Sequence, residues 1–376
     1  MNKFFGMIKK GVARVFKYEN HYISKVEGAK EWVYISYIPE VFYNLWNEKY
    51  MNGHQSRQEM VKMVSIFNTM GYNVYVSNHV NYTLPDIDVK LIFGIEPGFV
   101  FAAKKYCNAK KIYYATGAYY GHQNKSIKER TDSFNRNNKT AYPYQRLVDI
   151  YNHLDFADKI LQIGSKFTID TYPEKYRGLI TTIHQSSTVN INNEYEIRYA
   201  PENEFMWIGG GGSILKGLDL IFDYFIANPS KTVHIIGVID KEFLDIYQNR
   251  LTENIHLHGF MNLNSEEFTS LAGRCNFLIY PSCTEGGCPG SVINAMAYGL
   301  IPIVSRWAAC DEIDGLGYIL NDLTQDSITS TIDYIDKLSL NEVTIKKGQC
   351  QNYVRDTYNI VRFVDEFTSY FKKIGV

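Results

Sequence analysis

The chain has 376 residues, 45% of them hydrophobic, and a formal net charge of −1 at pH 7. This length predicts two domains, each with its own apolar core. The balanced charge gives no reason to expect nucleic-acid binding, and no apolar stretch reaches membrane-spanning length.

The first 18 residues depart from this balance. Residues 1–18 carry five Lys or Arg and no acid, and their apolar side chains recur at helical spacing. Basic amphipathic segments of this kind are typical of helices that lie on anionic membrane surfaces. We therefore predict membrane contact through residues 1–18. A flexible basic tail, or a helix packed on the N-terminal domain, is the alternative.

Short apolar runs alternate with helical patterns through the N-terminal half, as expected of an α/β unit. The predicted strands are residues 32–38, 74–76, 90–95, 111–115 and 159–163. A helix with an apolar face begins after Gly53 and closes near Gly71. The polar stretch after residue 115 reads as a mobile loop.

A run of four glycines, 209–212, lies between a predicted strand, 205–208, and a helix that follows Lys216-Gly217. A glycine loop in this position is a phosphate cradle. The order Lys-Gly excludes a Walker A loop, and the glycine spacing excludes the dinucleotide fingerprint. Strands at 233–236, ending at Gly237, and at 254–260 continue the alternation.

The most informative segment runs from 277 to 305. A strand, 277–280, leads into a loop with one acid, Glu285, then a helix opening near Ser291 and a strand at 301–304. We expect the glycines of this loop to let the backbone approach a ligand closely. Amides at a helix N-terminus suit a phosphate or sugar hydroxyl, and a carboxylate suits polyol recognition.

Taken in order, these motifs resemble the donor half of retaining GT-B glycosyltransferases of family four, over roughly residues 200–355. Glu285-Gly286 resembles the Glu-Gly that opens the family's donor-sugar loop, and the A-M-A-Y-G of 295–299 resembles the end of its next helix. Lys216-Gly217 matches the end of the family's G-R-x-x-x-x-K-G. The chain departs from the family in two places. Asn294 replaces the glutamate that holds the ribose in the family, and Gly211 replaces the arginine of the family's glycine-loop motif.

The resemblance implies an α/β GT-B fold, with two Rossmann-like domains facing across a cleft. Residues 1–200 would bind the acceptor and 201–355 the nucleotide sugar, and a helix in 356–376 would cross back to the N-terminal domain. Lys216 would neutralise the donor diphosphate and Glu285 would orient the donor sugar. The remaining donor-side candidates are Gly210, Gly211, Gly212, Gly237, Phe260, Gly286, Gly287, Ser291 and Asn294.

The acceptor side matches the family more loosely. The candidates there are Gly53, Ser56, Arg57 and Thr116. Arg57 would supply the missing cation, or it is an exposed arginine at a helix start. His122 would be an acceptor-side catalytic group, or it belongs to the polar loop.

We therefore predict a hexosyltransferase that moves a sugar from a nucleotide-diphosphate sugar to a saccharide or lipid-linked acceptor with retention, in bacterial surface polysaccharide or glycoconjugate synthesis. We expect no cofactor, no metal and no nucleic-acid partner. Without a C-x-x-C pair or a recognisable signal peptide, we expect reduced cysteines in a cytoplasmic enzyme, on the inner face of the membrane if residues 1–18 bind there. The alternatives are a nucleotide-sugar epimerase of related fold, or a catalytically silent protein that binds a sugar or a partner.

Overall fold

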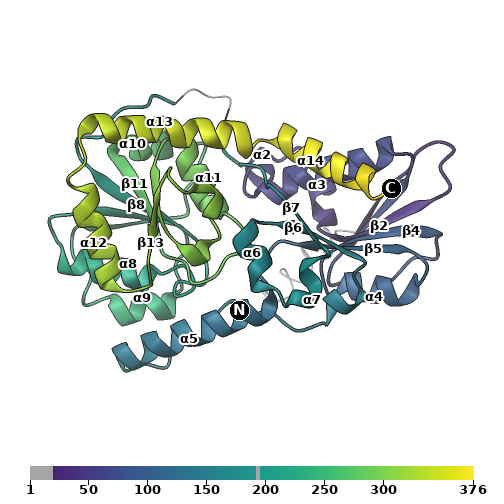
Figure 1. The fold of residues 1–376 in the computed structure, drawn as a ribbon, viewed down its shortest axis with the longest axis horizontal. Coiled ribbons are helices and arrows are strands. Elements are labelled where there is room, and N and C mark those ends of the chain that lie inside the picture. Colours follow the sequence, from purple (N-terminus) through teal and green to yellow (C-terminus); the bar gives the residue numbers. More distant parts are fainter. Residues whose placement is uncertain (1–19, 192–194) are drawn as a thin grey trace, which may run out of the picture. The chain divides into compact units, whose positions relative to one another are not determined.

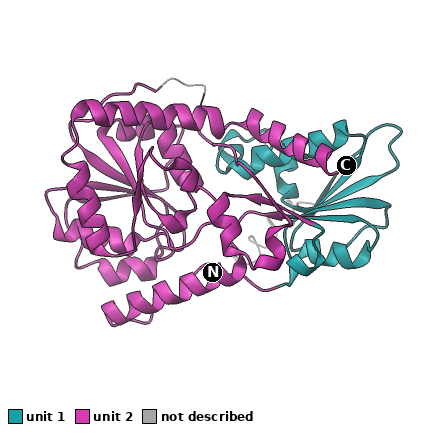
Figure 2. Ribbon diagram, viewed as in Figure 1, with its two compact units in different colours: residues 1–113, 151–158 teal, residues 114–150, 159–376 magenta. Residues whose placement is uncertain are grey.

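A computed structural model describes residues 20–191 and 195–376. The predicted membrane segment, 1–18, lies outside the described residues. The chain forms two compact units, one of residues up to 113 with 151–158 and one of residues 114–150 with 159–376 (Figure 2). The domain boundaries expected near residues 200 and 355 stay a prediction.

The first unit is built on mainly parallel strands. β2 runs parallel to β3 and β4, β4 runs parallel to β5, and β1 pairs antiparallel with β3. The strands are β1 (His21–Ser24), β2 (Trp32–Tyr37), β3 (Asn73–Asn78), β4 (Val89–Gly94) and β5 (Lys110–Ala115), and the helices are α2 (Glu48–Met51), α3 (Gln55–Thr69) and α4 (Gly98–Lys105). Its described residues also form the 3-10 helices η1 (Pro39–Tyr43) and η2 (His153–Phe156).

The second unit includes those residues of the N-terminal half that are not in the first unit, namely 114–150 and the residues from 159 onward. It contains α5 (Tyr120–Asn138), β6 (Lys159–Ile163), α6 (Lys166–Thr171), α7 (Glu174–Arg177) and β7 (Ile180–Ile183). β6 and β7 are parallel, and the strand order of the first sheet is β1-β3-β2-β4-β5-β6-β7.

The second sheet is parallel throughout, in the order β10-β9-β8-β11-β12-β13. Its strands are β8 (Glu204–Ile208), β9 (Val233–Ile236), β10 (Ile255–Gly259), β11 (Cys275–Tyr280), β12 (Ile301–Ser305) and β13 (Tyr318–Leu320). Its helices are α8 (Leu218–Ala227), α9 (Lys241–Tyr247), α10 (Glu266–Arg274), α11 (Gly290–Ala297), α12 (Gln325–Ile335) and α13 (Leu340–Thr357), with 3-10 helices η3 (Arg306–Ala308) and η4 (Asp311–Ile313) after β12.

Helices cover both faces of this sheet, with α10, α11 and α13 on one side and α8, α9 and α12 on the other (Figure 1). Every residue of β8, β11 and β12 is consequently buried, as is typical of parallel strands, and their sequences are near-continuous apolar runs. The expected α/β architecture with two Rossmann-like sheets is confirmed.

The mobile-loop reading of the polar stretch after residue 115 is wrong. Residues Tyr120–Asn138 form α5, with Ile127, Thr131 and Phe134 buried at a helical spacing that the many polar neighbours obscured. The last helix, α14 (Ile360–Lys373), contacts β7, and Glu366 accepts a hydrogen bond from the backbone N–H of His184 at 2.8 Å. Among the described residues, no helix combines the length and the apolar character that a membrane span needs.

Candidate functional site

The carboxyl ends of three neighbouring strands meet at glycines. Gly209 follows β8, Gly237 follows β9, and Gly259 ends β10. Gly209 N–H donates to the Ile236 carbonyl at 2.9 Å, and Gly237 N–H donates to the Gly259 carbonyl at 2.7 Å. A Cβ on Gly237 would lie 1.4 Å from the Gly209 carbonyl oxygen, so no other residue fits there. Ligands of open α/β sheets bind at this edge.

Lys216 is folded back onto the glycine run. Its Nζ donates to the Gly210 carbonyl at 2.9 Å, and Trp207 Nε1 donates to the Lys216 carbonyl at 3.3 Å. Burial lowers the pKa of Lys216, and the nearby charge of Glu285 opposes that shift. No atom lies within 4 Å of a Cβ built on Gly210 or Gly211, so the run is open on that side.

Glu285 is anchored by two hydroxyl groups. Its Oε1 accepts hydrogen bonds from Tyr280 Oη at 2.9 Å and Ser282 Oγ at 3.1 Å. Burial raises the pKa of Glu285, and Lys216 is the largest of the influences that oppose the rise. The two predicted donor-side groups therefore lie close enough to act on each other's ionisation.

The loops that carry Lys216 and Glu285 are tied together through the backbone. The Leu215 carbonyl accepts from Cys283 N–H at 2.8 Å. Gly217 has φ +70°, and a Cβ there would lie 2.2 Å from the Pro281 carbonyl oxygen. Glycine at 217 thus permits the close approach that brings the two loops together.

Gly286 and Gly287 pack against other backbone. A Cβ on Gly286 would lie 2.4 Å from Gly117 Cα, and one on Gly287 would lie 2.8 Å from Gly164 Cα. Gln162 Nε2 donates to the Gly117 carbonyl at 3.0 Å and to the Gly286 carbonyl at 3.3 Å. This packing is sufficient reason for glycine at both positions, and their contact with a ligand stays a prediction.

Asn294, placed by the resemblance at the ribose, has its amide engaged by protein. Its Oδ1 accepts from Ser187 Oγ at 2.8 Å and Thr188 N–H at 3.2 Å, and its Nδ2 donates to Thr188 Oγ1 at 2.8 Å. Ribose binding by Asn294 stays a prediction, and it requires these bonds to be shared or exchanged.

Phe260 and Ser291 are two further donor-side candidates. Phe260 follows β10 with 66% of its surface exposed, and Val238, after β9, is 65% exposed. Ser291 is the second residue of α11, whose first residue is Gly290 rather than the expected Ser291. Contact of Phe260 and Ser291 with a nucleotide stays a prediction.

His122 lies in the first turn of α5, and Thr116 is exposed directly after β5. His122 Nε2 is buried without a hydrogen-bond partner, and burial lowers the pKa of this histidine. The imidazole is therefore neutral at pH 7, as a general base must be.

Three acceptor-side candidates lie in the first unit. Ser56 Oγ bonds to His54 Nδ1 at 2.8 Å at the start of α3, where His54 is the N-cap. The Arg57 guanidinium stacks on the Tyr50 ring at 3.9 Å and donates to the Tyr50 carbonyl, folding over Gly53. Arg57 is therefore already engaged, and its role as second cation stays a prediction.

Arg146 is the residue that sequence reasoning missed. It lies between α5 and β6, and its side chain reaches Gly212, since a Cβ on that glycine would lie 2.7 Å from Arg146 Cγ. Its charge also acts on Lys216 and Glu285. No motif marks Arg146, because the contact joins residues more than 60 positions apart.

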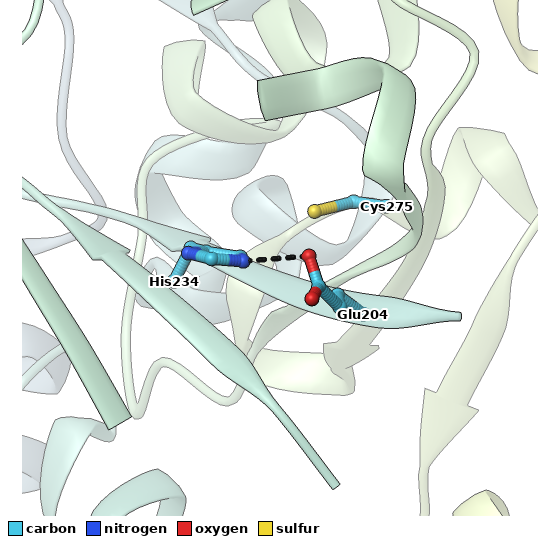
Figure 3. Close-up of side chains that lie close together, drawn as sticks. All are labelled: Glu204, His234 and Cys275. Atoms are coloured by element: carbon cyan, nitrogen blue, oxygen red, sulfur yellow. Dashed lines mark hydrogen bonds and ion pairs between the residues drawn. The ribbon is translucent and has the colours of Figure 1, made fainter. Parts of the chain in front are cut away.

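A group that could hold a metal lies at the opposite, amino-terminal ends of β8, β9 and β11 (Figure 3). The ligand atoms of Glu204, His234 and Cys275 lie within 4.8 Å of one another. Both carboxylate oxygens of Glu204 are occupied, one by His234 Nε2 at 2.8 Å and one by Arg274 at 2.6 Å. The hydrogen-bonding capacity of the Glu204 carboxylate is therefore satisfied by His234 and by the Arg274 guanidinium, as in a structural network of charged side chains.

Comparisons with known proteins agree with this geometry. Residues 203–336 match the family model of glycosyl transferases group 1. An uncharacterised glycosyltransferase of Methanocaldococcus jannaschii is 21% identical over 296 residues, which cover 74% of this chain and 71% of that protein.

Solved structures share the fold at low sequence identity. Sucrose-phosphate synthase from Thermosynechococcus elongatus has a TM-score of 0.63 at 12% identity, covering 92% of this chain and 99% of that one. Anabaena HepE in complex with UDP-glucose has a TM-score of 0.59 at 10% identity, covering 91% and 99%. Residues 203–336 therefore resemble a group 1 glycosyltransferase domain, and the likeness to these solved structures confirms the expected GT-B fold.

Proposed function

We propose that the protein transfers a sugar from a nucleotide-diphosphate sugar to a saccharide or lipid-linked saccharide acceptor, with retention of anomeric configuration and without a metal. The observation that carries this proposal is the placement of Lys216 and Glu285 on two hydrogen-bonded loops at the carboxyl edge of a parallel sheet, beside a glycine run that is open on one side. The complexes of HepE with UDP and UDP-glucose support a nucleotide-sugar donor.

The roles that we propose for the individual residues follow from their charges. Departure of the diphosphate leaves negative charge that must be stabilised, and the Lys216 ammonium together with amides of the glycine run would do this. Glu285, held by Tyr280 and Ser282, would accept hydrogen bonds from sugar hydroxyls. His122 would act on the acceptor side as a neutral base.

The proposal is tested by donor turnover. Purified protein is incubated with UDP-glucose and with other nucleotide sugars, and release of nucleoside diphosphate is measured with and without saccharide acceptors. We expect donor-dependent release that survives EDTA, because Lys216 and backbone amides are proposed to replace a metal.

Each alternative gives a different result. Conversion of the donor to an epimer in the absence of an acceptor would identify an epimerase. Binding without release of diphosphate would identify a silent protein. Loss of activity in EDTA with rescue by manganese would overturn metal independence.

A further inference from the structure

We propose that Arg146 is the second cation of the donor diphosphate site, supplied by the segment between α5 and β6 in place of the arginine that the family motif has at Gly211. This inference rests on the proposed function, because it concerns the same ligand.

The position of Arg146 is the first support. Its Cγ and Cδ would lie 2.7 and 3.7 Å from a Cβ on Gly212, so its aliphatic stem lies along the glycine run. Its charge lowers the pKa of both Lys216 and Glu285, which places the guanidinium near these two groups. A second cation close to Lys216 repels the Lys216 ammonium, and a bound anion would offset that repulsion.

The backbone that presents Arg146 is held firmly. Gln123 Nε2 of α5 donates to the Arg146 carbonyl at 3.1 Å. Asn124 forms a two-way pair with Val148, in which Nδ2 donates to the Val148 carbonyl at 2.9 Å and Oδ1 accepts from its N–H at 2.9 Å. These bonds hold Arg146 at φ +63°, a conformation that is uncommon for a residue with a side chain.

A second set of hydrogen bonds joins the segment between α5 and β6 to the residues that follow the glycine run. Tyr142 Oη donates to Asp240 Oδ2 at 3.0 Å, and Ser213 Oγ donates to the same oxygen at 3.0 Å. The segment is thus attached both to α5 and to the residues that follow the glycine run. Arg146 lies between these two points of attachment.

Among the described residues, the Arg146 guanidinium has no anionic partner. Within the part of the chain that the structure describes, no ion pair or hydrogen bond involves the Arg146 side chain, whereas Arg130 of α5 pairs with Asp219 at 2.6 Å. A planar guanidinium without a carboxylate partner is suited to bidentate binding of a phosphate. Binding of a phosphate would explain why an exposed arginine is held in an uncommon backbone conformation beside the glycine run.

The test is calorimetric titration of the full chain with uridine, guanosine and adenosine diphosphates, followed by use of the tightest as probe. We expect Arg146→Met to weaken probe binding by about 10- to 100-fold, the usual range for a lost charge-assisted hydrogen bond. Arg146→Lys should retain part of the affinity. Arg136→Met, at an exposed cation in the last turn of α5, is the matched control and should bind as the wild type does.

Lys216→Met separates the two proposals. If Lys216→Met weakens binding and Arg146→Met, with an unchanged melting temperature, does not, the assignment of Arg146 is overturned and the proposed function stands. If the wild type binds none of the three diphosphates, the proposed donor site fails and the inference fails with it.

Discussion

Removal of the Lys216 charge is expected to lower the kcat/KM for the donor by about 30- to 900-fold. A unit charge about 4 Å from a phosphate oxygen is worth about 4 kcal/mol at an effective dielectric constant of 20. Burial lowers the pKa of Lys216, so part of that energy offsets desolvation of the ammonium. The remaining 2–4 kcal/mol, roughly the loss seen when one group that stabilises transition-state charge is removed, gives the range above.

Lys216→Met is the appropriate change because it keeps the aliphatic stem. Lys216 Cδ lies 3.1 Å from where a Cβ on Gly209 would be, so the stem fills space beside the run. The assay is release of nucleoside diphosphate at several donor concentrations, with circular dichroism to confirm folding. Lys241→Met is the control, since its side chain is 88% exposed and pairs with Asp245 at 3.1 Å in the same domain.

Two results would refute the reasoning. One is a folded Lys216→Met variant whose kcat/KM stays within about twofold of the wild type. The other is an equal fall in Lys241→Met, which would show that the total charge of the domain, rather than the position of Lys216, determines the rate.

Three further predictions follow from other parts of the structure. Glu285→Gln should lower transfer at least tenfold more than it weakens binding of the free diphosphate, measured by kinetics beside calorimetry; equal losses would remove Glu285 from the sugar site. Two carboxylates raise the pKa of His184 to about 9, so the stability that His184 contributes is complete below pH 6.5 and disappears as the pH rises through 9. Between pH 6.5 and 9, the free energy of unfolding of the wild type should therefore fall more than that of His184→Gln, by up to about 3.4 kcal/mol, and an equal fall in both would contradict the assignment. Gly237→Ala should destabilise the second sheet by more than about 3 kcal/mol in denaturant titrations, because its Cβ would overlap the Gly209 carbonyl, whereas Gly273→Ala has no atom within 4 Å of the added carbon and serves as control.

The sequence was informative where a pattern is local. The strands β8, β9 and β11 appeared as short apolar runs ending at Gly or Pro, and the structure has strands at these places. The ends of elements were less certain, as with α11, which begins one residue before the expected Ser291. The polar composition of α5 concealed a helix whose buried positions are four and three residues apart.

Features that depend on distant contacts were not predictable from the sequence. The glycines at 286 and 287 were expected to approach a ligand, but their nearest neighbours are Gly117 and Gly164, more than 100 residues earlier. Asn294 was placed at a ribose by its position in a motif, and its amide bonds with residues 187 and 188. Such partners are set by the tertiary fold, and no local pattern specifies them.

The contact of Gly286 with Gly117 and Gly164 makes the Glu285 loop inseparable from the ends of β5 and β6. Gln162 and Thr168 both donate to the Gly286 carbonyl, so moving the loop would break two buried hydrogen bonds at once. Residues 115–117, 162–164 and 286 should therefore exchange their amide hydrogens as one cooperative unit, at a rate set by a shared opening. A side chain at position 286 would overlap the backbone of Gly117, so the conformation of this loop has correspondingly little freedom to vary.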